Sequence, residues 1–425
     1  MLKGEAIESI SRIVMEYFKA QKFEFIPGKT KIPLQWPSYG YEEVNEAIES
    51  LLSTWVTMGK KVNAFENIFA NYLGAKYATM VNSGSSANLA VLTALTNPSL
   101  RDRIKKGDEI ITPTVTWATT VYPIVNVGAK PVFVDVGFDY NIDVDKIESS
   151  ITEKTSAIMP VHLLGNPCDI KRIMEIAEEH DLFVIEDNCE SYGAEVDGRK
   201  VGTFGDVGTS SFFISHHITT IEGGMVNTDD EELFELLKQI RVFGWIRDLK
   251  EREAIAKKYS NIDPRFLFIN MGFNLRPTEI QGAFGMHQMK KLDDFIKIRK
   301  DNAEYWNKRL EEFSDYLILP KERLGTRHVW FCYPITVKPS APFKRKELTD
   351  FLESRKIETR PIQSGNMVEQ PVSEFLDYKV FGELKNSKII MTNSFFFGNH
   401  QRIGETEREY VADSIEEFIK QKVRR

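Results

Sequence analysis

The sequence is poor in cysteine and has no long apolar run, and these two absences exclude several classes of protein. Its 425 residues include three cysteines, Cys168, Cys189 and Cys332, which are too few and too scattered for a disulfide framework and suggest a reducing compartment. No apolar stretch approaches the length of a membrane span, and the N-terminus lacks the apolar core of a signal peptide. We therefore expect a cytoplasmic protein without a membrane partner.

Basic charge and histidine are also scarce. The net charge is −7, whereas proteins that bind nucleic acid usually carry a basic excess, so we expect no nucleic-acid partner. The chain has seven histidines and no His-x-x-x-His spacing, so we predict no metal centre. The length is sufficient for a large core and favours two domains.

Lysine is absent between Lys200 and Lys238. Within this stretch, residues 211–224 follow an apolar strand-like run and contain the adjacent histidines His216 and His217. Imidazole groups transfer protons near neutral pH. Neighbouring side chains point in different directions in most backbones, so we expect only one of the two histidines to face a site.

Strand-like and helical segments alternate along much of the chain. Strands are expected at 77–81, 109–112, 130–136, 155–161, 182–186, 206–213 and 225–228, and helices at 5–20, 41–53, 116–125, 144–151, 169–180, 231–243, 276–314 and 405–420. The alternation from residue 109 to 230 predicts an α/β fold with a mainly parallel sheet. In such sheets, ligands bind at the carboxyl ends of the strands.

Towards the C-terminus, a strand-like segment at 329–337 and a helical one at 345–355 predict a smaller α+β domain. We divide the chain into an N-terminal helix and arm (1–35), a large α/β domain (36–300) and a small C-terminal domain (301–425).

Four residues at strand ends or helix starts could carry chemistry. Gly84 and Ser85 lie in a turn between a strand and a helix, where backbone N–H groups either bind an anion or merely begin the helix. Asp187 ends an apolar run, where it could hold the protonated nitrogen of a pyridine ring or cap a helix. Trp117 begins a helix, where it could stack on a flat cofactor or fill the core.

Together these stretches resemble the sugar aminotransferase and dehydratase family of the DegT/DnrJ/EryC/StrS type, which uses pyridoxal phosphate on the aspartate-aminotransferase fold (fold type I). The resemblance runs from about residue 27 to the C-terminus. The stretches that carry it are 82–89, 186–190, Ser211-Phe212 with 222–224, and 272–276.

The resemblance implies a role for each matching residue. Gly84, Ser85 and Ser211 correspond to ligands of the cofactor phosphate, Asp187 to the acid that binds the pyridine nitrogen, and Trp117 to the aromatic residue that stacks on the ring.

Three further positions have implied roles. Asn274 corresponds to an asparagine that reaches the phosphate of the neighbouring subunit, which implies a homodimer with shared active sites. Glu190 lies where aminotransferases usually have a glutamine near the ring hydroxyl, and we keep it as a cofactor-binding residue. Arg360 is the expected substrate-binding arginine.

One departure from the aminotransferase pattern indicates the reaction. Aminotransferases of this family have a lysine five residues after the serine that Ser211 matches, and here that residue is His216. Lysine binds the cofactor covalently and moves protons, whereas imidazole only moves protons. The loop, together with stretches 27–33 and 357–361, resembles the nucleotide-sugar 3-dehydratase branch. This implies that His216 is the catalytic base and that His217 contacts the substrate.

The branch removes the carbon-3 hydroxyl of a GDP- or CDP-linked 4-keto-6-deoxy sugar to give a 4-keto-3,6-dideoxy sugar. Its cofactor is pyridoxamine phosphate, and L-glutamate regenerates this amine form from pyridoxal phosphate. The product would serve a surface polysaccharide such as the O-antigen of lipopolysaccharide.

Some members of the branch hold an iron–sulfur cluster on four cysteines. Here Arg247-Asp248 is followed by no cysteine until Cys332, so we expect the route without a cluster. Two other functions stay open: a nucleotide-sugar aminotransferase whose lysine comes from elsewhere in space, and a non-catalytic regulator that binds pyridoxal phosphate.

Overall fold

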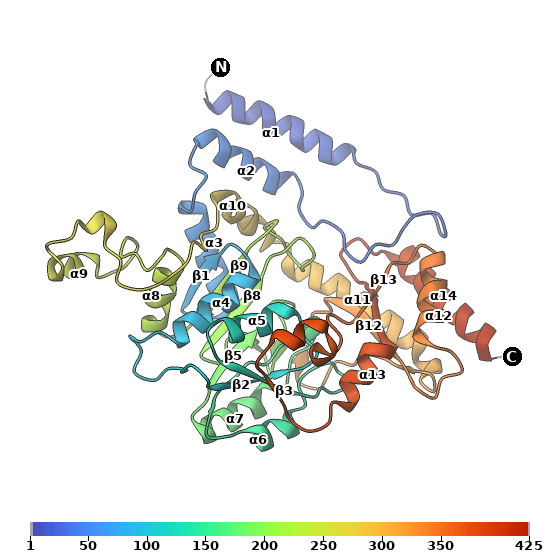
Figure 1. The fold of residues 1–425 in the computed structure, drawn as a ribbon. Coiled ribbons are helices and arrows are strands. Elements are labelled where there is room, and N and C mark those ends of the chain that lie inside the picture. Colours follow the sequence, from blue (N-terminus) through green and yellow to red (C-terminus); the bar gives the residue numbers. More distant parts are fainter. Residues whose placement is uncertain (1–2, 424–425) are drawn as a thin grey trace.

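An eight-stranded sheet forms the centre of the larger part of the protein (Figure 1). The computed structural model describes residues 3–423. Every neighbouring pair from β8 to β14 is parallel, whereas β9 is antiparallel to both β1 and β8, which confirms the predicted mainly parallel sheet. In spatial order the strands are β1 Tyr77–Val81, β9 Gly224–Thr228, β8 Val207–Ser211, β5 Phe183–Asp187, β4 Thr155–Ile158, β2 Glu109–Pro113, β3 Lys130–Val134 and β14 Lys379–Val380.

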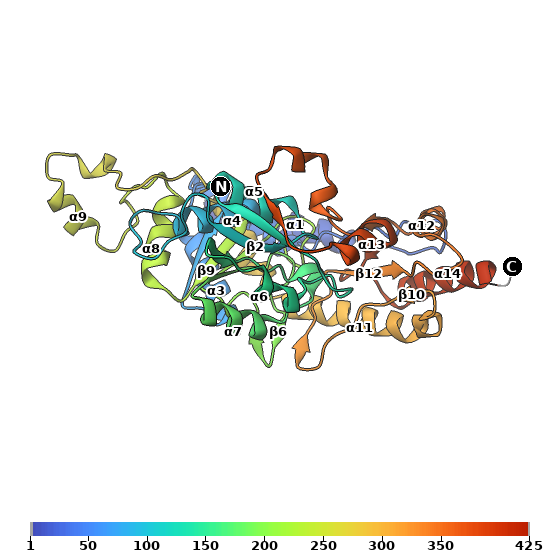
Figure 2. The same cartoon turned by 60° about the horizontal axis from the view of Figure 1, so that its bottom comes forward.

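Helices cover both faces of this sheet (Figures 1 and 2). Successive strand residues alternate between two hydrophobic cores, because side chains along a strand point to opposite faces. Ile110 and Ile185 pack on one face, and their neighbours Ile111 and Val184 pack on the other. Burial on both faces explains why the strands read as continuous apolar runs. The first face is covered by α4 Gly84–Leu95, α5 Ala118–Asn126 and α8 Glu231–Ile240, and the second by α3 Lys60–Leu73, α6 Ile147–Ser150 and α7 Ile170–His180.

A smaller antiparallel sheet forms a second core near the C-terminus, and we call this part the small lobe. Its strand order is β10 Leu317–Ile318, β12 Cys332–Val337, β15 Ser394–Gly398 and β13 Thr359–Pro361. The rings of Trp306, Tyr333 and Phe397 lie 4.9 to 5.1 Å apart in its centre. The helices of the small lobe are α11 Leu292–Leu310, α12 Arg345–Ser354, α13 Lys385–Asn393 and α14 Glu405–Val423.

The segment 276–314, expected as one helix, forms two. Helix α10 (Glu279–Gln288) ends at a tight turn in which the Lys290 and Lys291 N–H groups bond to carbonyls three residues earlier, and α11 then begins. The predicted domain boundary at residue 300 falls inside α11. Ile296 of this helix packs into the core of the large sheet and Trp306 into the small lobe, so the two parts share one helix.

The N-terminal helix α1 (Lys3–Ala20) lies along α2 (Tyr41–Ser53), and the arm between them reaches the small lobe (Figure 1). The Ile32 N–H donates to Lys356 O at 2.8 Å, and the Glu358 N–H donates to Ile32 O at 3.0 Å. Within residues 3–423, no helix combines the length and the apolar character needed to cross a membrane.

The remaining elements are short. Helix α9 (Arg252–Lys258) lies on a segment that projects from the body of the protein (Figures 1 and 2). A three-stranded sheet contains β11 Thr326–Arg327, β6 Glu195–Val196 and β7 Arg199–Lys200. Turns of 3-10 helix lie at Val144–Lys146, Leu163–Gly165, Pro264–Phe266, Glu311–Phe313, Met367–Glu369 and Pro371–Phe375.

We predict that Phe69→Ala destabilises the protein by about 3–5 kcal/mol, because it leaves a cavity where a fully buried ring packs on Phe212 at 5.3 Å. Urea unfolding measures this change. The control is Phe375→Ala, since Phe375 is 83% exposed and its removal should change stability by about 0.5 kcal/mol or less. Equal effects of the two variants would contradict the core described here.

Candidate active site

A cavity of about 830 Å³ opens at the carboxyl ends of β5 and β8, between the large sheet and the small lobe. This is the edge at which parallel sheets bind ligands. The cavity brings together most of the residues selected from the sequence, namely Gly84, Ser85, Trp117, Asp187, Glu190, Ser211, His216 and Arg360. Asn274 and His217 do not line it.

An anion-binding cradle lies where α4 begins. The Ser83 hydroxyl accepts a hydrogen bond from the Ser86 N–H at 3.1 Å and caps the helix. The first N–H groups of a helix have no partner within the helix, and they favour an anion. A Cβ atom on Gly84 would lie 2.5 Å from Ser211 Cβ, so only glycine lets the helix approach the end of β8 this closely. The cradle of Gly84, Ser85 and Ser211 fits a phosphate group.

Asp187 is held in one orientation at the end of β5. Its Oδ2 accepts hydrogen bonds from Asn88 Nδ2 at 3.0 Å and Thr120 Oγ1 at 2.8 Å, and its Oδ1 accepts one from the Cys189 N–H at 3.2 Å. A buried carboxylate requires such partners. Because Asp187 also lines the cavity, it fits the protonated nitrogen of a pyridine ring. Neither Asn88 nor Thr120 was selected from the sequence, although Asn88 lies in the stretch that carried the resemblance.

Trp117 contributes an aromatic ring to the cavity. It precedes the first residue of α5 and is 56% exposed, so it is not a core residue. A flat cofactor could stack on this ring. The site therefore has a cradle for a phosphate group, a buried acid and an exposed aromatic ring. Together these features fit the pyridoxal phosphate or pyridoxamine phosphate implied by the sequence.

His216 lines the cavity on the loop after β8, and its ring lies 5.4 Å from the ring of Phe331. Burial, and next the nearby Arg299 guanidinium, lower the His216 pKa to about 3. The imidazole is therefore neutral near pH 7 and has one unprotonated ring nitrogen.

His217 points away from the cavity. Its side chain is fully buried, and its Nε2–H donates to Val329 O at 2.8 Å. A fully buried side chain offers no atom to a ligand in the cavity, so this placement corrects the assignment of His217 to substrate binding. The alternation of side-chain directions predicted that only one of the two histidines would face the cavity but could not identify which one.

Arg299 of α11 supports the wall on which His216 packs. It is buried, and its Nη1 donates to Phe331 O at 2.7 Å and to Trp330 O at 3.4 Å. Within the described part of the chain, no carboxylate forms an ion pair with Arg299. The sequence showed no sign of this role, because an arginine on an amphipathic helix usually faces solvent.

Glu190 lines the cavity with its carboxyl group bound on both oxygens. Oε2 accepts a hydrogen bond from the Leu164 N–H at 2.8 Å, and Oε1 accepts one from Gln363 Nε2 of the small lobe. Burial raises the pKa of Glu190 to about 8, so the carboxyl group is mostly protonated at neutral pH. Gln363 was not selected from the sequence, although it lies three residues after Arg360.

Two cationic side chains flank Glu358 in the wall of the cavity. Arg360 lies 3.3 Å from the Glu358 carboxylate, and Lys31 of the N-terminal arm lies 2.8 Å from it. Both cationic side chains are more than half exposed. Arg360 lines the cavity and could approach an anionic substrate, whereas Lys31 does not line it.

Asn274 lies outside the cavity on the segment that carries α9. It is exposed, and its Oδ1 accepts a hydrogen bond from Arg276 Nε at 2.9 Å. One subunit alone therefore does not bring Asn274 to the other site residues.

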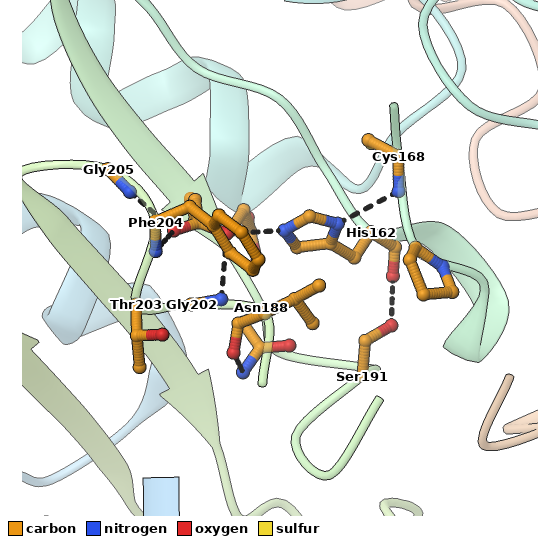
Figure 3. Close-up of polar contacts among 12 residues, drawn as sticks. His162, Cys168, Asn188, Ser191, Gly202, Thr203, Phe204 and Gly205 are labelled. Carbon is orange, nitrogen blue, oxygen red and sulfur yellow. Dashed lines mark hydrogen bonds and ion pairs between the residues drawn. The ribbon is translucent and has the colours of Figure 1, made fainter. Parts of the chain in front are cut away.

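A buried polar cluster anchors the end of β5 behind the cavity (Figure 3). His162 Nδ1 accepts a hydrogen bond from the Cys168 N–H at 3.0 Å, so the proton lies on Nε2, which donates to the Glu186 carboxylate at 2.9 Å. The Ser191 hydroxyl donates to His162 O. The Glu186 carboxylate also accepts hydrogen bonds from the N–H groups of Gly202, Phe204 and Gly205 at 2.6 to 2.7 Å.

The described residues contain one group of side chains with the spacing of metal ligands. Glu148, Glu179 and His180 form it on the surface, where all three are exposed. None of them lines the cavity.

The sequence and the fold match known proteins over nearly the whole chain. Residues 37–416 match the DegT/DnrJ/EryC1/StrS aminotransferase family. The chain is 43% identical to a GDP-4-keto-6-deoxy-D-mannose 3-dehydratase of Yersinia pseudotuberculosis, over 87% of this chain and 94% of that protein. It is 36% identical to the lipopolysaccharide biosynthesis protein RfbH of Salmonella typhimurium, over 97% of this chain and 98% of that protein.

A solved structure extends the match to three dimensions. A GDP-4-keto-6-deoxymannose-3-dehydratase with a trapped PLP-glutamate geminal diamine has a TM-score of 0.85 and 38% identity to this chain, over 90% of this chain and 99% of that one. The sheet order, the site and these matches agree: the chain belongs to the DegT/DnrJ/EryC1/StrS aminotransferase family, with its fold type I architecture.

Proposed function

We propose that this protein is a pyridoxamine-phosphate-dependent 3-dehydratase that acts on a GDP-linked 4-keto-6-deoxy sugar. One observation carries the proposal: His216 lines the cavity beside the residues that fit the cofactor, and no lysine of the described residues lines it. The choice of GDP over CDP rests on the name of the Yersinia relative. We further propose that the product serves a surface polysaccharide and that the enzyme acts in the cytoplasm.

The residues that line the cavity have separate roles. Gly84, Ser85 and Ser211 hold the cofactor phosphate, Asp187 holds the ring nitrogen, and Trp117 covers the ring. When bound, the cofactor supplies an amine for the keto group and an electron-accepting ring.

The cavity also contains groups for proton transfer and for substrate binding. His216 accepts a proton on its neutral imidazole and later returns it. The protonated imidazole is cationic, and the nearby Arg299 cation disfavours this form. Arg360 binds the anionic part of the substrate. L-Glutamate restores the amine form of the cofactor, and the trapped PLP-glutamate geminal diamine in the solved relative supports this step.

We also propose a homodimer with shared sites. Asn274 lies outside the cavity of its own subunit, and its segment exposes Phe266 (69%), Met271 (82%) and Phe273 (39%). Exposed apolar side chains gathered on one segment favour a protein interface. A second copy of the chain that covers this segment would bring Asn274 to the neighbouring site.

The residues of the cavity do not suit either of the two alternative functions. A nucleotide-sugar aminotransferase needs a lysine amine in reach of the cofactor, and the described lining contains none. A non-catalytic regulator would not need a neutral imidazole among the cofactor-binding groups.

We predict that borohydride treatment of the protein loaded with pyridoxal phosphate leaves the mass of the intact chain unchanged, because no lysine is available to form a reducible bond with the cofactor. Intact-mass spectrometry measures this. A mass gain of one reduced cofactor, mapped to a lysine in the site, would instead favour an aminotransferase.

We predict that His216→Asn lowers the rate of substrate dehydration by roughly 10²- to 10⁴-fold, because the base is lost while the shape of the loop is kept. Product mass, followed over time, measures the rate. His217→Asn, with its melting temperature recorded, is the comparison and should retain turnover in the folded fraction. Loss of turnover in folded His217→Asn alone would contradict the assignment of His216 as the base.

We predict that inactive His216→Asn and Asn274→Ala proteins regain activity when their subunits are mixed. In a mixed dimer with shared sites, one site contains His216 from one subunit and Asn274 from the other, both unchanged. Refolding the two variants together and assaying dehydration tests this. Each variant refolded alone is the control, and an inactive mixture that contains verified mixed dimers would show that Asn274 does not act across the interface.

A further inference from the structure

We infer that Glu190 is a second catalytic residue, the acid that delivers a proton to the hydroxyl group leaving carbon 3 of the sugar. This inference rests on the proposed dehydratase function and assigns its leaving-group step. The predicted contact of Glu190 with the cofactor ring does not by itself include such a role.

Glu190 and His216 are held on the same wall of the cavity. The Leu164 N–H donates to Glu190 Oε2 at 2.8 Å, and the Phe331 N–H donates to Leu164 O at 3.0 Å. The Phe331 ring in turn lies 5.4 Å from the His216 ring. The acid and the base are therefore linked through two short backbone segments that hydrogen-bond to each other.

The backbone segments on this wall cannot separate easily. Gly165 has a φ of +92°, and a Cβ atom there would lie 2.7 Å from Trp330 N. The Val329 N–H donates to Gly165 O at 2.9 Å. A glycine thus permits the close approach that fixes Leu164 against Phe331.

The hydrogen bonds of Glu190 use both of its oxygens as acceptors. A backbone N–H can only donate, so Oε2 is an acceptor for Leu164. Gln363 Nε2 donates to Oε1, so neither bond uses the acidic proton of the carboxyl group. A glutamine amide can donate or accept, so Gln363 can pair with Glu190 before and after the proton leaves.

The charged surroundings favour opposite protonation states for the two groups. Asp187 and Cys189 on its own segment and Cys332 on β12 surround Glu190, and burial raises the pKa of both thiols, so Asp187 is the anion that disfavours a second negative charge. On the side of His216, the Arg299 cation disfavours a positive imidazole. A protonated carboxyl and a neutral imidazole in one cavity are the pairing of acid and base that dehydration requires.

The step balances without another reactant. His216 would accept the proton of the C–H bond that breaks, and the electron pair of that bond would shift through the conjugated C–N bonds to form a new double bond at carbon 3 as the C3–O bond breaks. The leaving oxygen would keep the C3–O electron pair and take the proton of the Glu190 carboxyl group, which gives water. The Glu190 carboxylate then regains a proton from His216 or from solvent.

Glu190→Gln is the test, because an amide keeps the size of the side chain and its bonds to Leu164 and Gln363 but has no acidic proton. We expect dehydration to slow by roughly 10²- to 10⁴-fold. Amine transfer from L-glutamate to bound pyridoxal phosphate expels no hydroxyl, so its rate, followed by cofactor absorbance, should fall much less than the rate of dehydration. The control is Glu311→Gln, an exposed carboxylate on the small lobe.

Two outcomes would overturn the inference. Dehydration by Glu190→Gln within about twofold of the unchanged protein would show that the proton comes from elsewhere. Parallel loss of both reactions would show that Glu190 serves the cofactor alone. If the unchanged protein releases no water from GDP- or CDP-linked 4-keto sugars, the proposed function itself fails, and the inference fails with it.

A second measurement does not need the loaded enzyme. The infrared band of a protonated carboxyl group should be present in the cofactor-free protein at neutral pH and absent in Glu190→Gln. Because the folded pKa of about 8 exceeds the usual 4.5, the stability of the unchanged protein relative to Glu190→Gln should fall as pH rises from 4.5 to about 8. Equal bands and parallel stability curves would overturn the inference, even where Glu190→Gln loads cofactor poorly.

Discussion

Two adjacent carboxylates at the end of β5 must both be satisfied inside the protein, and the site is arranged around this constraint. Consecutive strand residues point to opposite faces, so Glu186 turns behind the sheet and Asp187 turns into the cavity. Glu186 accepts hydrogen bonds from three backbone N–H groups and from His162. That cluster fixes the loops on either side of the strand end (Figure 3), and Asp187 is then oriented by Asn88 and Thr120.

The electrostatics of the cavity follow from burial and from the position of one cation. Arg299 reaches the wall from α11, the helix shared by the large sheet and the small lobe, and binds the carbonyl groups of residues 330–331. Its charge reinforces the effect of burial on His216, whereas Glu190 is buried beside the anion Asp187. A neutral base and a neutral acid therefore coexist in one cavity, although their ordinary pKa values would make the carboxyl group the charged one.

The cavity of a single subunit has parts from distant regions of the sequence but does not include Asn274. The arm contributes residues 33–35, and the small lobe contributes Arg360 and Gln363. Asn274 pairs with Val242 where the segment that carries α9 rejoins the body of the protein, and this segment has exposed apolar side chains, so the proposed dimer would complete the site and cover this apolar surface. Completion of the site and burial of this surface would then depend on the same contact.

The sequence by itself determined the mainly parallel sheet, the family and the residues that line the cavity at strand ends, because these depend on local spacing. Turn 82–89 and the run that ends at Asp187 predicted where Gly84, Ser85 and Asp187 would meet. The replacement of a lysine by His216 was likewise visible in the sequence. The break between α10 and α11 was not, since a tight turn of three residues leaves the helical pattern nearly intact.

Only the tertiary structure decided which histidine faces the cavity, that Arg299 supports its wall, and that Gln363 pairs with Glu190. Each of these depends on packing between segments far apart in the chain. His217 donates a hydrogen bond to the carbonyl of Val329, which lies 112 positions later in the sequence. Gln363 donates one to Glu190, which lies 173 positions earlier. Such contacts form only when the small lobe folds against the sheet, and no local pattern encodes them.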